Sequence, residues 1–236
     1  MLNGTESMIR YAKLGIIELN VSDLLRSAEF YENIVGLESA TIVDAGSRRF
    51  RNSDDPYSVV LHEGDKPGVK KVGWQLEDEL QFEALFRALE SAQVRYEELS
   101  ETECNDRLFK QAARIVEPYS GAVFEFYLWA NDIIQTAWQP SVAKIQRLGH
   151  IALWTPQKDA CTKFLLDTLN FRFSDLIGDA VSFMRPFPSP YHHGIGIASR
   201  NETGLHHVNF MVSNIDDVGR AFHRFKREGV EIMKGI

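Results

Sequence analysis

Residues 13–19 read KLGIIEL, and residues 147–153 read RLGHIAL, at an offset of 134 (148 − 14). In both stretches apolar residues alternate with small or polar ones, as in a strand with one buried face. A second pair, VGWQL at 72–76 and VNFMV at 208–212, has an offset of 136 (208 − 72). The chain therefore repeats itself, and strand–helix units are expected to begin near residues 13, 71, 147 and 206.

Each of these four strands precedes a helical pattern. Ser22-Asp23 is predicted to cap a helix that Gly36 closes, and Thr155-Pro156 is predicted to open one that ends at Asn170. Acidic stretches at 79–94 and 215–230 follow the other two strands. The first three helices are followed by strand-like segments at 39–45, 47–52, 57–63, 107–118, 122–129, 172–178, 179–186 and 192–198.

This order predicts an α+β fold built from tandem β-α-β-β-β modules, of which the fourth breaks off at Ile236. Two such modules together can close a curved half-barrel sheet around a cavity. We therefore expect an N-terminal pair of modules at 1–135 and a C-terminal pair at 145–236 whose end is missing. The boundary is expected in the polar stretch 131–144.

Composition excludes several classes of function. Acidic residues outnumber basic ones by 33 to 26, and no basic run indicates a nucleic-acid partner. No apolar stretch reaches the ~18 residues of a membrane span, and the N-terminus has no apolar signal region. Cys104 and Cys161 are too few and too scattered for a disulfide framework, so we expect two reduced thiols in a cytoplasmic protein.

The histidines are distributed unevenly between the two halves. His150 and His207 lie on the first strands of the third and fourth modules, where the first half has Ile16 and Lys71. The repeat predicts that these two strands are neighbours, which would aim two imidazoles into one cavity. Two histidines and a carboxylate form the facial triad of non-haem Fe(II) oxygenases. The second half is thus predicted to hold a metal and the first to be structural.

Alternation along a strand leaves part of this hypothesis open. Only one residue of the pair His206-His207 can face the cavity, and the same holds for the pair at 192 and 193. The residues alone do not decide which. His62 ends a strand of the metal-poor half, and His223 lies on a helical pattern, so neither is expected to act in catalysis.

Three motifs together resemble type I extradiol ring-cleavage dioxygenases of the vicinal-oxygen-chelate group, such as the 2,3-dihydroxybiphenyl and homoprotocatechuate enzymes. They are LGHIAL at 148–153, YHHGIGIA at 191–198 and LHHVNFMV at 205–212, in that order. The resemblance covers nearly the whole chain. It implies an Fe(II) enzyme, with Mn(II) as an alternative, that opens a catechol beside its diol with O2 during aromatic-compound degradation.

The resemblance also implies roles for individual residues. His150 and His207 would be metal ligands, and His193 the acid–base histidine near bound O2. The third ligand would be a glutamate about 25 residues beyond Ile236, because its first-half counterpart, Glu125, maps to position 261 (125 + 136). Glu125 itself belongs to the other half and is not expected to replace it. Many relatives form oligomers, so a homo-oligomer is a further expectation.

Substrate choice is expected to depend on the cavity wall. Carboxylated catechols would need a cation, for which Arg185 is the candidate, and larger ones an apolar pocket. Apolar wall candidates are Phe183, Phe187, Tyr191 and Phe210. Two other functions fit the same scaffold, namely a metal-dependent isomerase or lyase of the glyoxalase type and a metal-free binding protein of the bleomycin-resistance type.

Overall fold

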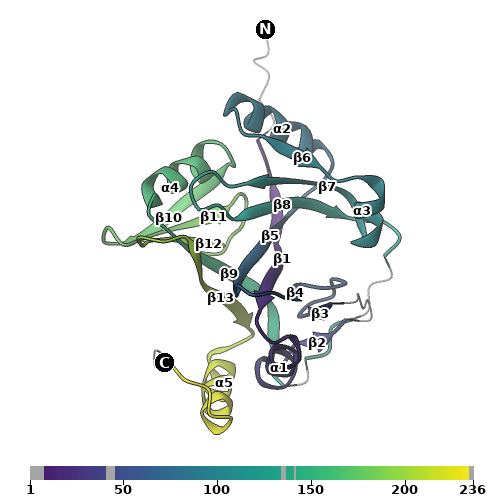
Figure 1. The fold of residues 1–236 in the computed structure, drawn as a ribbon, viewed down its shortest axis with the longest axis vertical. Coiled ribbons are helices and arrows are strands. Elements are labelled where there is room, and N and C mark those ends of the chain that lie inside the picture. The colour runs from purple at the N-terminus through teal and green to yellow at the C-terminus, as the bar shows by residue number, and fades with distance from the viewer. Residues whose placement is uncertain (1–7, 41–45, 134–136, 141, 234–236) are drawn as a thin grey trace. The chain divides into compact units, whose positions relative to one another are not determined.

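The computed structural model describes residues 8–40, 46–133, 137–140 and 142–233 (Figure 1). In that part of the chain, no helix combines the length and the apolar character needed to cross a membrane. The elements in chain order are β1 (Tyr11–Val21), α1 (Leu24–Glu29), η1 (Phe30–Val35), β2 (Glu38–Ser39), β3 (Ser47–Arg51), β4 (Val59–Glu63), β5 (Gly68–Leu76), α2 (Leu80–Ser91), β6 (Tyr96–Glu98), α3 (Glu101–Asp106), β7 (Phe109–Val116), β8 (Val123–Trp129), β9 (Ile145–Thr155), α4 (Lys158–Asp167), β10 (Phe171–Ile177), β11 (Val181–Pro186), β12 (Ile195–Ser199), β13 (Gly204–Val212) and α5 (Ile215–Arg227).

The predicted repeat is visible in the strand pairing. In each of the first three modules the first strand pairs in parallel with the last, through β1–β4, β5–β8 and β9–β12. The register is equivalent in all three, with Ile17 opposite Val59, Val72 opposite Phe124 and Ile151 opposite Ile195. The α+β fold predicted from the sequence is therefore confirmed. The strand β13 and the helix α5 follow, and their extension into a complete fourth module stays a prediction.

Two compact units emerge from the chain's internal contacts. The first comprises Met1–Gly15, Lys70–Ile133 and Gly149–Val208, and the second Ile16–Val69, Ile134–Leu148 and Asn209–Ile236. The division into domains at 1–135 and 145–236 stays a prediction, and part of its expected boundary lies outside the described residues. All three histidines singled out above belong to the first unit.

The core of the first unit is built around Trp74, whose side chain is 0% exposed. Its ring meets three other aromatic rings edge-on, at centroid distances of 6.2 Å to Tyr11, 6.0 Å to Phe124 and 5.0 Å to Phe171. Edge-to-face contacts of this kind add to the free energy gained by burying the rings. The Tyr11 hydroxyl donates to the carbonyl of Leu169 at 2.7 Å, which satisfies the one polar group of that ring.

Helix ends follow the predicted signals at three of four points. The Asp23 carboxylate accepts from the Arg26 N–H, and Gly36 and Asn170 have positive φ angles of 93° and 55°. The start predicted at Thr155-Pro156 is wrong, because Thr155 is the last residue of β9 and α4 begins at Lys158. The Thr155 hydroxyl donates to the Tyr119 carbonyl and accepts from the Gln157 N–H, so it holds the strand end instead of capping the helix.

The five-stranded sheet, in the order β10-β11-β12-β9-β13, has two different faces (Figure 1). The helix α4 contacts β10, β11 and β12 on one face, which includes the buried side chains of Met184, Ile195 and Ile151. The opposite face carries His150, Ala152, Phe183 and Gly196, and we call it the histidine face. Phe183, Gly196 and Ala152 form one row across three strands.

Both cysteines are free and buried, and we expect neither thiol to react with Ellman's reagent at pH 8 in the folded protein. Burial raises the pKa of the Cys161 thiol far above its usual range, and the Glu117 carboxylate, whose Oε2 lies 3.4 Å from Sγ, acts in the same direction. Burial also raises the pKa of Cys104. The thiolate is the reactive form, so both thiols should titrate only after unfolding in guanidinium. Rapid labelling of the native protein would contradict this expectation.

Candidate metal centre

His150 and His207 meet on neighbouring strands, as the repeat predicted. The strands β9 and β13 are adjacent in the sheet. His150 Nε2 lies 2.8 Å from His207 Nε2, and the ring centroids are 5.0 Å apart with an interplanar angle of 80°. Two imidazole nitrogens that bind one metal at about 2.1 Å lie roughly 3 Å apart. The two side chains thus already converge as ligands of a single ion would.

His193 lies beside this pair. Its ring centroid is 4.1 Å from that of His150 and 4.6 Å from that of Phe183. Its Nδ1 contacts His192 Nδ1 at 2.9 Å, whereas its Nε2 is buried and has no hydrogen-bond partner among the described residues. A buried polar atom left without a partner costs about 1–3 kcal/mol. Such an atom indicates that the site is built for a ligand that supplies the missing partner.

Electrostatics keep these imidazoles neutral. Burial lowers the pKa of His150 to about 3, with further lowering by the neighbouring His193 and His207. Burial likewise lowers the pKa of His193, assisted by His192 and His207. Metal ions bind the neutral imidazole, whose lone pair is free. At physiological pH, His150 and His193 are therefore in the neutral form.

The members of each histidine pair differ in what they contact. His206 stacks on Trp154, with ring centroids 4.4 Å apart, while Arg200 lies 4.1 Å over the same indole. His192 points toward Asp175, with Nε2 to Oδ2 at 3.8 Å. His207 and His193 are thus the members that face His150.

Sequence reasoning missed Trp154, although a signal for it existed. The residue lies four positions after His150 on the same strand, so a period of two places both side chains on one face. Phe183 had been named as a wall residue, and it does lie against His193. Phe187, by contrast, is enclosed by the guanidinium groups of Arg10 and Arg172, at 5.2 Å and 5.0 Å from the ring centroid.

The two histidines of the other regions are occupied elsewhere. His62 Nε2 lies 2.9 Å from Glu18 Oε2, and His223 is exposed on α5 beside Phe222. That neither side chain takes part in catalysis stays a prediction.

Among the residues that the structure describes, no third protein ligand lies near His150 and His207. Within residues 8–40, 46–133, 137–140 and 142–233, no group of three or more His, Cys, Asp or Glu side chains could hold a metal ion. The glutamate expected beyond Ile236 therefore stays a prediction. The donor set that is described, two converging imidazoles, fits the nitrogen half of a 2-His-1-carboxylate centre.

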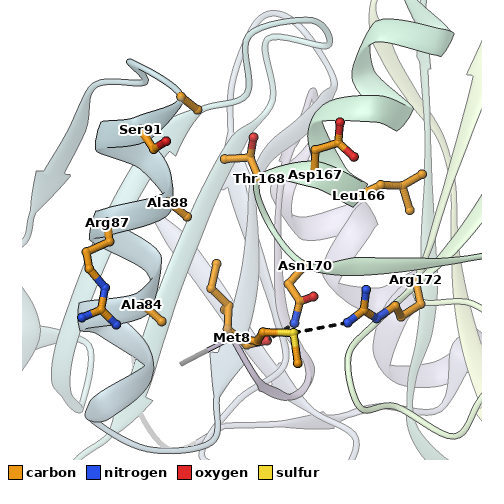
Figure 2. A pocket seen from close by; sticks show the side chains of 12 residues that line it. Met8, Ala84, Arg87, Ala88, Ser91, Leu166, Asp167, Thr168, Asn170 and Arg172 are labelled. Atoms are coloured by element: carbon orange, nitrogen blue, oxygen red, sulfur yellow. Dashed lines mark hydrogen bonds between the residues drawn. The ribbon is translucent and has the colours of Figure 1, made fainter. Parts of the chain in front are cut away.

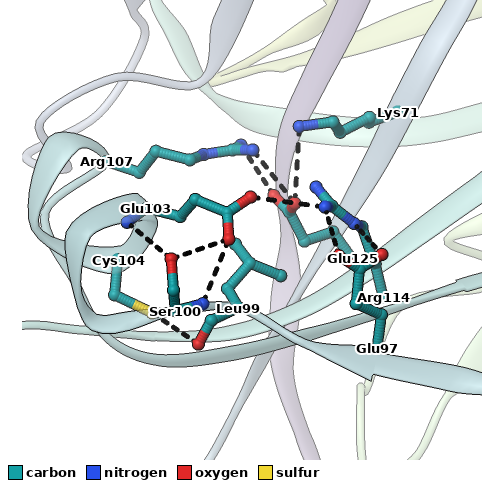
Figure 3. A network of polar contacts seen from close by, with 9 residues as sticks. All are labelled: Lys71, Glu97, Leu99, Ser100, Glu103, Cys104, Arg107, Arg114 and Glu125. Atoms are coloured by element: carbon teal, nitrogen blue, oxygen red, sulfur yellow. Dashed lines mark hydrogen bonds and ion pairs between the residues drawn. The ribbon is translucent and has the colours of Figure 1, made fainter.

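The equivalent place in the first half contains an ion cluster (Figure 3). Glu125, which is 1% exposed, binds the Arg107 guanidinium at 2.6 Å and 3.0 Å and lies 3.5 Å from Lys71 Nζ. Lys71 stands where the second half has His207, and Ile16 stands where it has His150. Glu125 is thus held by the cations Arg107 and Lys71, and the expectation that it does not replace the missing ligand stays a prediction.

A separate cavity of about 640 Å³ lies elsewhere in the first unit (Figure 2). Its walls are α2, the end of α4 and the start of β10, and none of its lining residues is a histidine. Arg172 reaches into it and donates to Met8 Sδ at 3.6 Å, and the side-chain amide of Asn170 donates to the Ile9 carbonyl. The cavity is therefore not the entrance to the candidate metal centre.

Comparison with known proteins agrees with this geometry. The chain is similar to an iron-dependent extradiol dioxygenase of Rhodococcus jostii, with 23% identity over 93% of this chain and 78% of the relative. It is 24% identical to a biphenyl-2,3-diol 1,2-dioxygenase of Paraburkholderia xenovorans over 92% of this chain and 76% of the relative. The crystal structure of BphC, a halotolerant catechol dioxygenase, superposes with a TM-score of 0.83 at 26% identity, covering 97% of this chain and 78% of that one.

A family model reaches across both halves of the repeat. The model of the Glyoxalase/Bleomycin resistance protein/Dioxygenase superfamily matches residues 13–126 and 147–236. These two ranges include every module described above and all three histidines of the candidate centre. The chain therefore belongs to the glyoxalase/bleomycin resistance protein/dioxygenase superfamily.

Proposed function

We propose that this protein is an extradiol dioxygenase, which opens a catechol ring beside its two hydroxyl groups with O2. The observation that carries the proposal is the convergence of His150 and His207 at 2.8 Å, with the unpartnered Nε2 of His193 beside them. Two neutral imidazoles and a nearby acid–base group are the parts that such a reaction needs from the protein. The named activities of the two sequence relatives support the same reaction class.

In this proposal, His150 and His207 hold a divalent metal, which we take to be Fe(II), with Mn(II) as the alternative. The predicted glutamate beyond Ile236 would complete the set. When bound, the metal would hold both vicinal oxygens of the catechol next to O2 and allow electrons to pass from the ring to oxygen. His150 is held as a neutral ligand, because burial lowers its pKa and so disfavours its protonation.

His193 is assigned the proton transfers. Its ring is fixed by contacts with His150, Phe183 and His192, so Nε2 has a defined position. The neutral ring can accept a proton at Nε2 as the catechol binds and return it to oxygen later. The carbon–carbon bond adjacent to the diol breaks, both atoms of O2 enter the product, and a yellow muconic semialdehyde results.

The proposal is tested by oxygen uptake. Full-length protein as its gene encodes it, purified without air and loaded with Fe(II), is mixed with 2,3-dihydroxybiphenyl and a panel of smaller catechols. We expect one O2 consumed for each yellow product formed. Isomerisation of a substrate without O2 uptake would favour a glyoxalase-type isomerase or lyase. Tight binding of a ligand without turnover would favour a metal-free binding protein.

A further inference from the structure

A positive charge lies on the histidine face at Arg185. Along β11 the side chains alternate, and Ser182 points toward α4, where its hydroxyl accepts from Lys158 Nζ at 3.4 Å. Met184 is likewise buried on the α4 face. Phe183 and Arg185 must therefore project from the opposite face, which also carries His150.

Arg185 has no acidic partner. Its Nη1 donates to the backbone carbonyl of Ser189 at 2.6 Å, and among the described residues no carboxylate lies within ion-pair distance of it. The side chain is half-buried, so its charge is only partly solvated. A guanidinium in this setting retains several donors and most of its attraction for an anion.

The neighbouring strand carries a second arginine. Arg172 on β10 lies directly opposite Arg185 in the register. The two arginines differ in their contacts, however. Arg172 stacks over Phe187 at 5.0 Å and donates to Met8 Sδ, whereas the one hydrogen bond of the Arg185 side chain to the described residues goes to the Ser189 carbonyl. Arg185 therefore keeps hydrogen-bond donors available for a ligand, and Arg172 is directed to other partners.

The acid of this face, Asp175, does not neutralise the pair. It stands opposite Phe183, one step further along the strands, and its Oδ2 lies 3.8 Å from His192 Nε2. Its carboxylate is largely exposed to solvent, so its field is screened. An anion at Arg185 would therefore meet a guanidinium group and no buried carboxylate.

The distance from the metal centre suits a substituent on the substrate ring. Phe183, whose ring is 4.6 Å from that of His193, lies two residues before Arg185 on the same face. Two residues of strand span about 7 Å. A ring held at His150 and His207 and packed against Phe183 would place an arm of two or three carbons beside Arg185.

We propose that Arg185 binds a carboxylate carried on the ring substituent, so that the preferred substrates are catechols with an acidic side chain. This inference rests on the proposed function, and it narrows the substrate class of the same site. Arg185 acts in specificity, because it contacts the substrate away from the reacting atoms. Charge-assisted pairing of a guanidinium with a carboxylate provides the selectivity.

The test compares 3-(2,3-dihydroxyphenyl)propanoate with its neutral amide. The iron-loaded full-length protein should cleave the acid with a kcat/KM about 10- to 100-fold above that of the amide, the range expected for one charged hydrogen-bonded contact. Arg185→Met should bring the ratio close to one, mainly by raising KM for the acid. Arg185→Lys, which keeps the charge, should restore part of the preference, and a thermal melt shows that each variant is folded.

Arg172→Met is the matched control, because it removes the register partner of Arg185 and should leave the ratio unchanged. A wild-type ratio near one, or a ratio that Arg172→Met abolishes and Arg185→Met does not, would overturn the inference while ring cleavage stands. If neither compound is cleaved, the proposed function fails. Calorimetric titration of the metal-loaded protein with each compound then shows whether Arg185 binds the carboxylate. Tighter binding of the acid that Arg185→Met removes supports the anion site, and equal binding of acid and amide overturns it.

Discussion

Replacing His207 with alanine is expected to lower kcat/KM for ring cleavage by more than about 100-fold. Substitution of a residue that only hydrogen-bonds to a metal ligand already lowers metal affinity or activity by about 10–100-fold. The substitution removes one of the two nitrogens that converge at 2.8 Å. The remaining imidazole of His150 and the predicted glutamate would hold a divalent ion more weakly than the full set of three ligands. The iron content per chain, measured after gel filtration, should therefore fall together with oxygen uptake. His150→Ala should behave in the same way.

His206→Ala provides the control for this prediction. His206 is the same residue type, one position earlier on β13, but it stacks on Trp154 and contacts His207 through Nδ1 at 2.7 Å, so it supports the ligand without approaching His150 in the same way. We expect it to lose less iron and less activity than His207→Ala does. Loss of iron in His206→Ala with retention in His207→Ala would reverse the assignment of the pair.

Trp74→Ala should destabilise the protein by about 3–5 kcal/mol, the range for removing a fully buried large aromatic side chain. The indole is 0% exposed and touches the rings of Tyr11, Phe124 and Phe171. Its loss leaves a void that three rigid rings cannot fill by small movements. The free energy of unfolding in urea, followed by circular dichroism, measures the effect.

Trp74→Phe separates the loss of volume from the loss of a polar group. The indole Nε1 is buried and has no hydrogen-bond partner among the described residues. Phenylalanine keeps a ring in place, removes that N–H and leaves a smaller cavity than alanine does, so the cost should be clearly lower than that of Trp74→Ala. A phenylalanine variant as unstable as the alanine variant would show that the indole nitrogen has a role in stability.

The repeat explains why so much of the fold could be predicted from the sequence. A strand of the third module has a recognisable copy in the first, so each sequence pattern strengthened the prediction made from the other. In the structure, the pairing Ile17–Val59 recurs as Ile151–Ile195. The short helix α3 was not predicted, although Ser100 and Glu103 form a capping box at its start. Six residues give too short a periodic pattern for recognition. The strand predicted at 39–45 is described only as far as Ser39 in β2, and 41–45 lie outside the described residues.

The candidate site was predictable in its strands and less so in its side chains. A period of two shows that His206 and His207 face opposite ways, but not which of them faces His150. That choice depends on the sheet's orientation relative to α4, which no local pattern contains. The residues that line the cavity were harder to predict, because Phe183 and Phe187 occupy equivalent positions in one alternating stretch of sequence. Only tertiary contacts place Phe183 against His193 and Phe187 between two arginines.

The ion cluster around Glu125 affects how the protein should respond to removal of a metal. Lys71 and Arg107 belong to the same chain as Glu125, so this buried carboxylate is balanced without any ion from the medium. The part of the first unit that surrounds Glu125 should therefore fold whether or not a metal is supplied. A chelator that empties the candidate metal centre should leave the ion pairs of Glu125 intact, because amino-acid side chains form them.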